Sequence, residues 1–573
     1  MAVDDKLPIL KMRNSLSTER TATFRLPKWL RDSYKNPDEF WTHYLELFTG
    51  YAGLPSRARY QEGYDFYHDL VTRNLEQRAP AFIHWAGDRG ELKLSYAALN
   101  QRCRALEAVW EASGVVAGDT IAVVLPMSPA YVVACLTALK MGAVVVSIPM
   151  FGRQFAIDYL EQSGATWWVT EDRYTYGVDC PAQRLALQGT AAPAAAANRS
   201  YFYAADETAL QVFSPVQDLQ SAPIEVSAQS LFLGVVRDAA LVLSLDAGDV
   251  LAAPGYCPLQ FQPCLLLSCL SVGATYVEMN ENQLEQIGPD LSRFELTHLM
   301  VTPRVRESLI RDQFKGVGDL KRWFRNAHGS LEWGRWDLFS AKAKSLNARG
   351  MSYFANAAAG GAVLHGVSRL QPQYLHVLPV AGSEYSMADT NLSGMPSVAE
   401  HGILEWTQLE SSETVLGQQL LSQDKDEYIL IGPIKPHRSG QSYPRDSVVG
   451  LTAEIAGIES TSIVYAPAGK STGGWQAILV VFVPPDSPVL AERSKLEQKL
   501  ATLCKVELGG RAVPDKIEVF GLVPHSEDDV VSQVWCESQY LTGMLHRKEQ
   551  VPAFRHLSKL RYAVKSLLQE QEG

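Results

Sequence analysis

The chain contains 573 residues, of which 46% are hydrophobic and 20% charged, and this is the composition of an ordinary globular protein. A chain of this length exceeds what a single hydrophobic core accommodates, so we expect at least two domains. The formal net charge of −11 at pH 7 argues against nucleic acid, or an anionic membrane surface, as the main partner.

The N-terminal region lacks the features of a targeting segment. Residues 1–17 contain no apolar stretch of the kind that marks a secretory signal peptide. Residues 20–75 are rich in aromatic and charged side chains, and Asn36 followed by Pro37 predicts the start of a helix. Eight cysteines are too few for a disulfide framework, and the cluster at 257, 264 and 269 has no metal-binding spacing. We therefore predict a cytoplasmic protein with buried, reduced thiols.

From about residue 80, strands alternate with helices. The expected strands read AFIHWAG, TIAVVLP, AVVVSIP and ATWWVT, and the helices between them read LSYAALNQRCRALEAVWEASG and SPAYVVACLTALKMG. Lys140 and Gly142 interrupt the most apolar run, which indicates a helix followed by a buried strand and not a membrane span. Apolar strands that alternate with helices predict a parallel, doubly wound sheet.

The second half of the chain repeats this pattern and then changes. Residues 187–200 are alanine-rich and are expected to form a surface loop, and a second α/β round follows over 228–305. Near residue 432 a proline- and glycine-rich turn predicts an interdomain hinge. We therefore predict an α/β fold with a large N-terminal domain of doubly wound sheets over 1–431. A small C-terminal α+β domain is expected over 432–573.

The stretch from Leu94 to Phe151 closely resembles the opening of the adenylate-forming (AMP-binding) superfamily, which includes acyl-CoA synthetases and the adenylation domains of peptide synthetases. Its order is the family's: a helix, a G-V-x-x-G-D strand, an L-P-x-S-P-x-Y helix and a G-A-V-V-V strand. The resemblance extends over about 37–540, and residues 1–75 are similar to the lead-in of acetyl-CoA-type synthetases. It implies an enzyme that adenylates a carboxylate with ATP and passes the acyl group to a thiol.

The phosphate-binding and metal-binding motifs of this superfamily are altered here. Its phosphate loop, S-G-T-T-G-x-P-K-G, aligns within residues 213–231, which contain no glycine and no lysine; the lysine position is Ala222. The Thr-Glu pair that holds Mg²⁺ aligns with Ala357 and Ala358, while the glycines at 360 and 361 remain. The resemblance therefore implies that no ATP phosphates and no metal are bound in the usual way.

The remaining catalytic positions are altered as well. The aspartate that holds the ribose hydroxyls is replaced by Gln418 or Gln419, and the hinge arginine by Pro433, whose fixed φ would hamper rotation of the small domain. The catalytic lysine aligns with Val530. Removal of even one stabilising donor commonly slows a reaction on the order of a hundredfold. We predict a degenerate member without catalytic residues and without a cofactor.

Some positions of the substrate pocket are candidates for retention. Gly329 and Ser330 fall where the superfamily's adenine-contacting turn lies, although a purely structural turn is the alternative. Phe354 and Asn356 lie beside the expected acyl tunnel. These residues are our predicted substrate-pocket residues.

We predict a pseudoenzyme of the acid–thiol (CoA) ligase class. It would act as a binding or scaffolding partner in an acyl-carrier or polyketide-type pathway. An acyl carrier protein or another pathway enzyme is the expected partner, with CoA or an acyl group as a further ligand. The alternative is a divergent but active ATP-dependent acyl-CoA or acyl-carrier-protein ligase. A third hypothesis is a ligand sensor or a new-chemistry enzyme that uses the vacated pocket.

The C-terminal region predicts an additional amphipathic helix. Its apolar residues recur at three- and four-residue spacing, and its polar positions are basic on an otherwise acidic protein. The apolar stripe consists of Phe554, Leu557, Leu560, Val564, Leu567 and Leu568. Either this stripe packs onto the chain's own domain, or it recruits an acidic partner such as a carrier protein.

Overall fold

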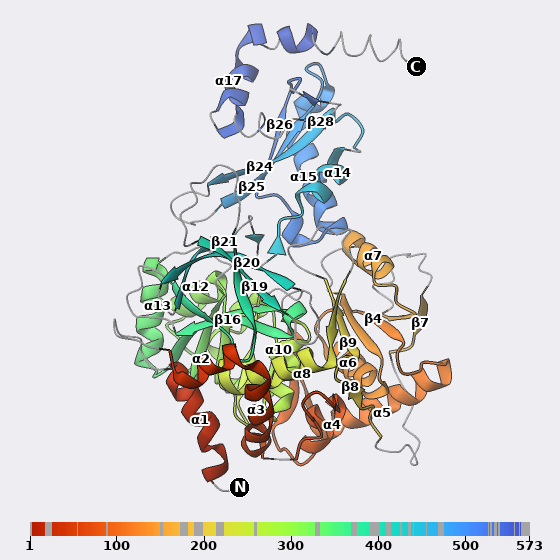
Figure 1. Cartoon of the computed structure of the whole chain (residues 1–573). Coiled ribbons are helices and arrows are strands. Elements are labelled where there is room, and N and C mark those ends of the chain that lie inside the picture. The colour runs from red at the N-terminus through yellow and green to blue at the C-terminus, as the bar shows by residue number, and fades with distance from the viewer. Residues whose placement is uncertain are drawn as a thin grey trace. The chain divides into compact units, whose positions relative to one another are not determined.

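The protein is described by a computed structural model, shown in Figure 1. The described residues are 3–17, 26–53, 55–87, 90–148, 153–171, 182–187, 199–213, 223–256, 261–326, 333–367, 375–389, 401–407, 414–424, 427–433, 437–438, 441–453, 455–467, 475–524, 526–527, 530–531, 536, 539–541, 543–554, 556–560 and 562. The chain divides into a large unit, 1–149 with 159–441, and a small unit, 150–158 with 442–573. This mixed α/β architecture, a large N-terminal part and a smaller C-terminal part, confirms the predicted fold class. The predicted boundary at 431/432 remains a prediction.

Aromatic residues of the N-terminal helices anchor them to the large unit. The helices are α1 (Val3–Ser17), α2 (Lys28–Lys35) and α3 (Pro37–Ala52). Helix α3 begins at Pro37, as its sequence predicts, because proline lacks the N–H that the first turn leaves unsatisfied. Its residues Trp41, Tyr44 and Phe48 are buried in the main hydrophobic core. Burial of each contributes roughly 1.5–3 kcal/mol.

The first large sheet has six strands in the order β10-β9-β5-β4-β6-β7 and is parallel except for β10. Its strands are β4 (Thr120–Val124), β5 (Val144–Ile148), β6 (Trp167–Val169), β7 (Gln183–Leu185), β9 (Thr208–Val212) and β10 (Ile224–Ser227). Helix α6 (Pro129–Met141) packs against β4 and β5, and α5 (Tyr96–Ser113) packs on α6 (Figure 1). The predicted alternation of buried strands and helices is confirmed here.

The second sheet has thirteen strands, of which one half is parallel and the other antiparallel. The parallel half is β2 (Pro80–Trp85), β12 (Thr275–Glu278), β11 (Val250–Ala252), β13 (His298–Val301), β14 (Arg322–Asn326) and β15 (Arg349–Asn356), edged by the antiparallel β3 (Glu91–Ser95). The antiparallel half is β16 (Gly361–Val367), β17 (Leu375–Pro379), β21 (Glu427–Pro433), β20 (Thr414–Asp424), β19 (His401–Thr407) and β18 (Tyr385–Asp389). Helices α10 (Cys264–Ser271), α12 (Pro303–Arg311) and α13 (Trp333–Ser345) pack against strands of the parallel half, and α11 (Glu281–Ile287) packs on α12. Helix α8 (Ala228–Arg237) packs against β9, β10 and β16.

The small unit has its own core. Strands β24 (Ser460–Pro467), β25 (Trp475–Phe482) and β26 (Lys516–Phe520) form its sheet, beside helices α14 (Arg445–Ala453) and α15 (Arg493–Glu507). Helix α17 (Met544–Gln550) follows, and Arg493 on α15 forms an ion pair with its Glu549. Beyond α17, Phe554, Leu557 and Leu560 are 41%, 52% and 51% exposed. The other three members of the predicted apolar stripe lie outside the described residues.

Two further observations concern the part of the chain that the structure describes. None of its helices is long and apolar enough to cross a membrane. It also contains no group of three or more His, Cys, Asp or Glu side chains arranged to hold a metal ion.

Cys264 and Cys269 are buried on α10, whereas residue 257 lies outside the described residues. Most of the predicted loop over 187–200 also lies outside them.

Candidate ligand pocket and the altered nucleotide motifs

The turn between β15 and β16 carries the positions that align with the Thr-Glu pair. It is a single 3-10 turn, Ala357–Ala359, capped by Asn356, whose Oδ1 accepts a hydrogen bond from the Ala358 N–H at 3.1 Å. The methyl groups of Ala357 and Ala358 are completely buried. The turn itself therefore offers no side-chain carboxylate for Mg²⁺, the Asn356 amide oxygen accepts from the backbone, and the Asp238 carboxylate behind the turn is bound by Arg237 and the Ala362 N–H. These residues do not fit the metal that the resemblance implies.

The glycines after this turn are retained for a packing reason. Gly360 has a φ of +72°, and a Cβ there would lie closer to the Ser230 carbonyl oxygen on α8 than the 3.0 Å below which real Cβ contacts are essentially never seen. The approach is reciprocal, because a Cβ on Gly234 of α8 would collide with the Gly360 carbonyl oxygen. Glycine permits both the left-handed backbone and this close contact. The scaffold of the motif is kept where its ligand-binding side chains are absent.

A buried ion pair supports the same turn from behind. Asp238 Oδ2 accepts a hydrogen bond from the Ala362 N–H at 2.5 Å, and Asp238 Oδ1 accepts one from Arg237 Nη2 at 2.9 Å. Arg237 Nη2 also donates to the Ala362 carbonyl at 2.7 Å. Burial raises the pKa of Asp238, and Arg237 together with the hydrogen bonds offsets part of that rise. Removing either partner alone would leave an uncompensated buried charge, which is strongly destabilising.

The predicted pocket residues are only partly described. Phe354 (2% exposed) and Asn356 (5% exposed) are buried near the end of β15, next to the turn. Gly329 and Ser330 lie outside the described residues, as do residues 214–222 of the altered phosphate loop. The loop resumes at β10, where the Glu225 carboxylate accepts a hydrogen bond from Thr208 Oγ1 at 3.2 Å.

For the other altered positions the structure shows the strand to which each residue belongs and its partner in the neighbouring strand. Gln418 and Gln419 lie in β20, and Gln419 is the register partner of Pro433 at the end of β21. Val530 begins the short strand β28 (Val530–Val531) and pairs with Glu527 of β27 (Ser526–Glu527). The predicted hinge proline is therefore the last residue of a paired strand.

A cavity of about 740 Å³ lies in the large unit, and neither Phe354 nor Asn356, the two predicted pocket residues that the structure describes, lines it. Its wall is built where strands end: Ser128 follows β4, Glu171 follows β6, and Glu278 is the last residue of β12. Carboxyl ends of parallel strands are the usual place for ligands in α/β proteins. Its volume is within the usual range of about 300–1,000 Å³ for small-molecule sites.

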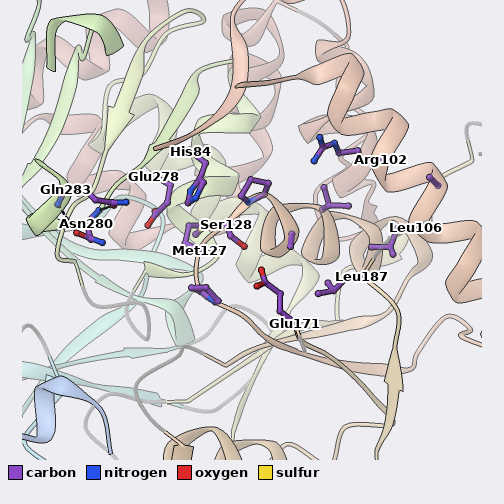
Figure 2. A pocket seen from close by; sticks show the side chains of 15 residues that line it. His84, Arg102, Leu106, Met127, Ser128, Glu171, Leu187, Glu278, Asn280 and Gln283 are labelled. Atoms are coloured by element: carbon purple, nitrogen blue, oxygen red, sulfur yellow. Dashed lines mark hydrogen bonds between the residues drawn. The ribbon is translucent and has the colours of Figure 1, made fainter. Parts of the chain in front are cut away.

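The polar wall of this cavity centres on Glu278 and His84, which are register partners in the neighbouring strands β12 and β2. Figure 2 shows their side chains next to one another. Burial raises the pKa of Glu278 to about 8. At neutral pH most Glu278 carboxyl groups are therefore protonated, so Glu278 acts as a hydrogen-bond donor without a charge.

The lower edge of this wall is fixed by a capping box on α11. Gln283 Oε1 accepts a hydrogen bond from the Asn280 N–H at 2.7 Å, and Asn280 Oδ1 accepts one from the Gln283 N–H at 2.9 Å. Gln283 Nε2 also donates to the Trp85 carbonyl at 2.8 Å, which ties the helix to β2. The amides of Asn280 and Gln283 are thus held in place before any ligand binds.

The opposite wall is apolar. It consists of Leu106 from α5, Met127 and Val133 around the start of α6, and Leu187 after β7, with Arg102 from α5 beside it (Figure 2). The cavity thus combines an apolar wall with a polar wall that carries hydroxyl, amide, imidazole and carboxyl groups, which suits a ligand with a hydrocarbon part and a polar end.

Comparisons with known proteins find similarity to AMP-binding enzymes over part of the chain. A family model described as "AMP-binding enzyme" matches residues 72–226. The acetyl-coenzyme A synthetase of Mesorhizobium japonicum is 30% identical over 132 residues, which is 20% of each chain. The malformin synthetase mlfA of Aspergillus niger is 25% identical over 282 residues, or 48% of this chain and 6% of that protein. The chain thus spans about a fifth or less of the length of these curated relatives.

Solved structures match over much more of the chain. The amide bond synthetase McbA from Marinactinospora thermotolerans has a TM-score of 0.63 at 13% identity and covers 83% of this chain and 99% of its own. The acetoacetyl-CoA synthetase from Streptomyces lividans has a TM-score of 0.59 at 15% identity and covers 93% and 92%. An artificially fused adenylation–PCP di-domain, NpsA-ThdA from Klebsiella oxytoca, has a TM-score of 0.61 at 14% identity and covers 80% and 87%. At such identities these likenesses show the fold.

Proposed function

Because this chain belongs to the adenylate-forming superfamily, we propose that it binds an acyl group carried on a thiol and does not adenylate carboxylates. The observation that supports this proposal most directly is the pair of fully buried alanines, Ala357 and Ala358, at the turn where the superfamily's motif has Thr and Glu. A side chain that would coordinate Mg²⁺ against polyphosphate is missing there, and the buried methyl groups fill its place.

The proposed ligand is an acyl thioester, and it would occupy the cavity of about 740 Å³. Its hydrocarbon part would lie along Leu106, Met127 and Val133, and its carbonyl oxygen would accept a hydrogen bond from the protonated Glu278 carboxyl. A thioester carbonyl is uncharged, so it suits a site whose carboxyl group is held neutral by burial.

The proposed physiological role is that of a binding or scaffolding partner in an acyl-carrier or polyketide-type pathway. One structural neighbour is a fused adenylation–PCP di-domain, which supports a carrier protein as the presenting partner. In this role the chain would hold a carrier-bound acyl group for another pathway enzyme. A divergent, ATP-dependent ligase is the outcome that the following experiments would reveal if the proposal is wrong.

Calorimetry with acyl thioesters of pantetheine in the absence of ATP tests the ligand. We expect saturable binding that strengthens with chain length, by up to about 0.8 kcal/mol for each buried methylene. The variant Ala130→Trp places a bulky ring on the cavity lining and should weaken binding at least about tenfold, the equivalent of 1.4 kcal/mol. Ala112→Trp, on the exposed end of α5, is the matched control and should bind like the wild type.

A second titration, with Mg-ATP, tests the loss of nucleotide binding. We expect no saturable heat at millimolar nucleotide. Micromolar Mg-ATP affinity, or equal thioester affinity in the Ala130→Trp and Ala112→Trp variants, would contradict the proposal.

A further inference from the structure

A second helical stretch follows α17 near the C-terminal end of the small unit (Figure 1). Residues 552–554, 556–560 and 562 are helical. Val551, which caps α17, has an extended backbone, and Pro552 then begins the new stretch, where a helix leaves its first N–H groups unbonded. The stretch is therefore separate from α17.

Helix α17 itself is fixed to the small unit. Its Leu545 is completely buried in the core of that unit, together with Phe520 of β26. Its Glu549 accepts a hydrogen bond from the Gly521 N–H at 3.0 Å and another from Arg493 Nη1 at 3.2 Å. The helical stretch thus extends from an anchored helix.

The stretch faces the small unit with polar side chains. Ser558 is buried, and Lys559 forms an ion pair with Asp486 in the loop after β25. Leu557 is exposed, and it lies two residues before Lys559. Residues at that spacing do not share a side of a helix. The side of the stretch that carries Leu557 therefore points away from the described part of the small unit.

Three apolar residues share this outward side. Phe554, Leu557 and Leu560 follow one another at three-residue spacing, and all three are exposed. We call these three residues the C-terminal apolar face. Surface helices ordinarily turn such a stripe toward the core, and here the orientation is reversed.

No similar row occurs elsewhere on the described residues. Outside 541–560, their exposed large apolar side chains occur singly on separate elements, such as Leu7 on α1 and Leu338 on α13. Single exposed apolar residues are normal, whereas a group of them marks an interaction surface. The C-terminal apolar face is therefore a candidate docking surface.

The charge of the segment indicates the kind of partner. Residues 543–565 contain six lysines and arginines against a single acidic residue, Glu549, and this carboxylate is paired with Arg493. The basic residues are Arg547, Lys548, Arg555, Lys559, Arg561 and Lys565. Because the whole chain has a net charge of −11, the rest of it is even more acidic than this total. The apolar face thus lies in a basic segment of an acidic protein.

This charge distribution favours one occupant over two others. An anionic membrane surface would repel the acidic remainder of the chain. A second copy of the chain would bring two basic segments together, which is unfavourable. An acidic protein avoids both forms of repulsion, and the row of apolar residues fits the apolar stripe of another helix, ridge into groove.

We propose that the C-terminal apolar face docks an acidic amphipathic helix of a partner protein. Phe554, Leu557 and Leu560 would pack against its apolar stripe, while the basic side chains of the segment attract its carboxylates. This inference goes beyond acyl binding and does not depend on the acyl cavity, so the two proposals fail separately.

A synthetic acidic peptide of about three heptads tests the surface, with Leu at positions a and d, Ala at b and f, and Glu at the others. Its binding to the full chain is measured by fluorescence anisotropy. We expect saturable binding that weakens at least about threefold when the salt concentration is raised from about 0.05 M to about 0.5 M. A peptide of the same composition without the leucine stripe should bind at least about tenfold more weakly.

The variant Leu557→Gln removes the centre of the C-terminal apolar face. It should weaken binding of the acidic peptide at least about tenfold and leave the melting temperature nearly unchanged, because Leu557 is exposed. The matched control is Leu338→Gln, which alters an exposed leucine on α13 of the large unit. Its affinity for the peptide should remain within about twofold of the wild type.

Five results would overturn the proposal. Three concern the peptide and the fold: no binding of the acidic peptide, equal affinities in Leu557→Gln and Leu338→Gln, or a clear loss of thermal stability in Leu557→Gln, which would place the face against its own unit. Binding to vesicles of phosphatidylserine and phosphatidylcholine in place of the peptide would assign the face to membranes. A dimer that Leu557→Gln dissociates would assign it to a second copy of the chain.

Discussion

Glu278 is expected to make the stability of the large unit fall as pH rises. The ordinary pKa of 4.5 is raised to about 8 by burial in the folded protein. Between these values the folded state holds a proton that the unfolded state has lost. Stability therefore declines by up to about 1.36 kcal/mol per pH unit across this window, and the decline is complete above the folded pKa.

The size of the effect follows from the two pKa values. Their difference corresponds to an upper limit of about 5 kcal/mol at pH 9. Because the Glu278 side chain is only partly buried from solvent, we expect about half of this limit. The variant Glu278→Gln has nearly the same shape as the protonated side chain and cannot ionise. It should equal the wild type in stability near pH 4.5 and exceed it increasingly toward pH 9.

Urea denaturation from pH 4.5 to 9, followed by tryptophan fluorescence, measures this difference. The control is Glu76→Gln, which alters an exposed carboxylate in the same unit. Its pH dependence should follow that of the wild type. If Glu278→Gln also parallels the wild type over the whole range, the neutral state of Glu278 in the folded protein is refuted, and with it the donor assigned to the acyl site.

Three further predictions concern packing, the domain boundary and the C-terminus. Gly→Ala within a helix usually stabilises a protein by about 0.5–1 kcal/mol. Gly234→Ala should instead destabilise the protein by about 1–3 kcal/mol in a thermal melt, because its Cβ meets the Gly360 carbonyl. The control Gly318→Ala, with open space around the new Cβ, should change the stability little. Limited proteolysis should cut first within 432–445, and early cleavage elsewhere with this segment intact would contradict the predicted hinge. Deletion of residues 550–573 should leave the melting temperature unchanged and abolish binding of an acidic carrier protein, because the described apolar residues of that segment are exposed. A destabilised truncation would instead mean that the segment packs onto its own unit.

Local patterns in the sequence were sufficient for the α/β core. Pro37 after Asn36 predicted the start of α3, and the β-branched runs predicted β4 and β5, because these signals act within a few residues. The antiparallel half of the thirteen-stranded sheet was not predicted, since no helix alternates with its strands. Hydrophobic periodicity alone does not distinguish which sheet such strands join.

The cavity could not be predicted from local patterns. Glu278 meets His84 only because β12 pairs with β2, although the two residues are far apart in the chain. Only a weaker signal was present in the sequence: a polar residue at the end of a strand, as at Glu278, marks the edge of a parallel sheet where ligands bind.

The central claim is that this member of the superfamily does not activate carboxylates with ATP. The direct measurement is ATP–pyrophosphate exchange with the full chain, Mg²⁺ and a panel of carboxylic acids from acetate to long-chain fatty acids. The buried alanines at 357 and 358 predict exchange no faster than in a reaction without protein. Robust exchange that depends on one carboxylic acid would contradict the claim and identify the chain as an active, divergent ligase.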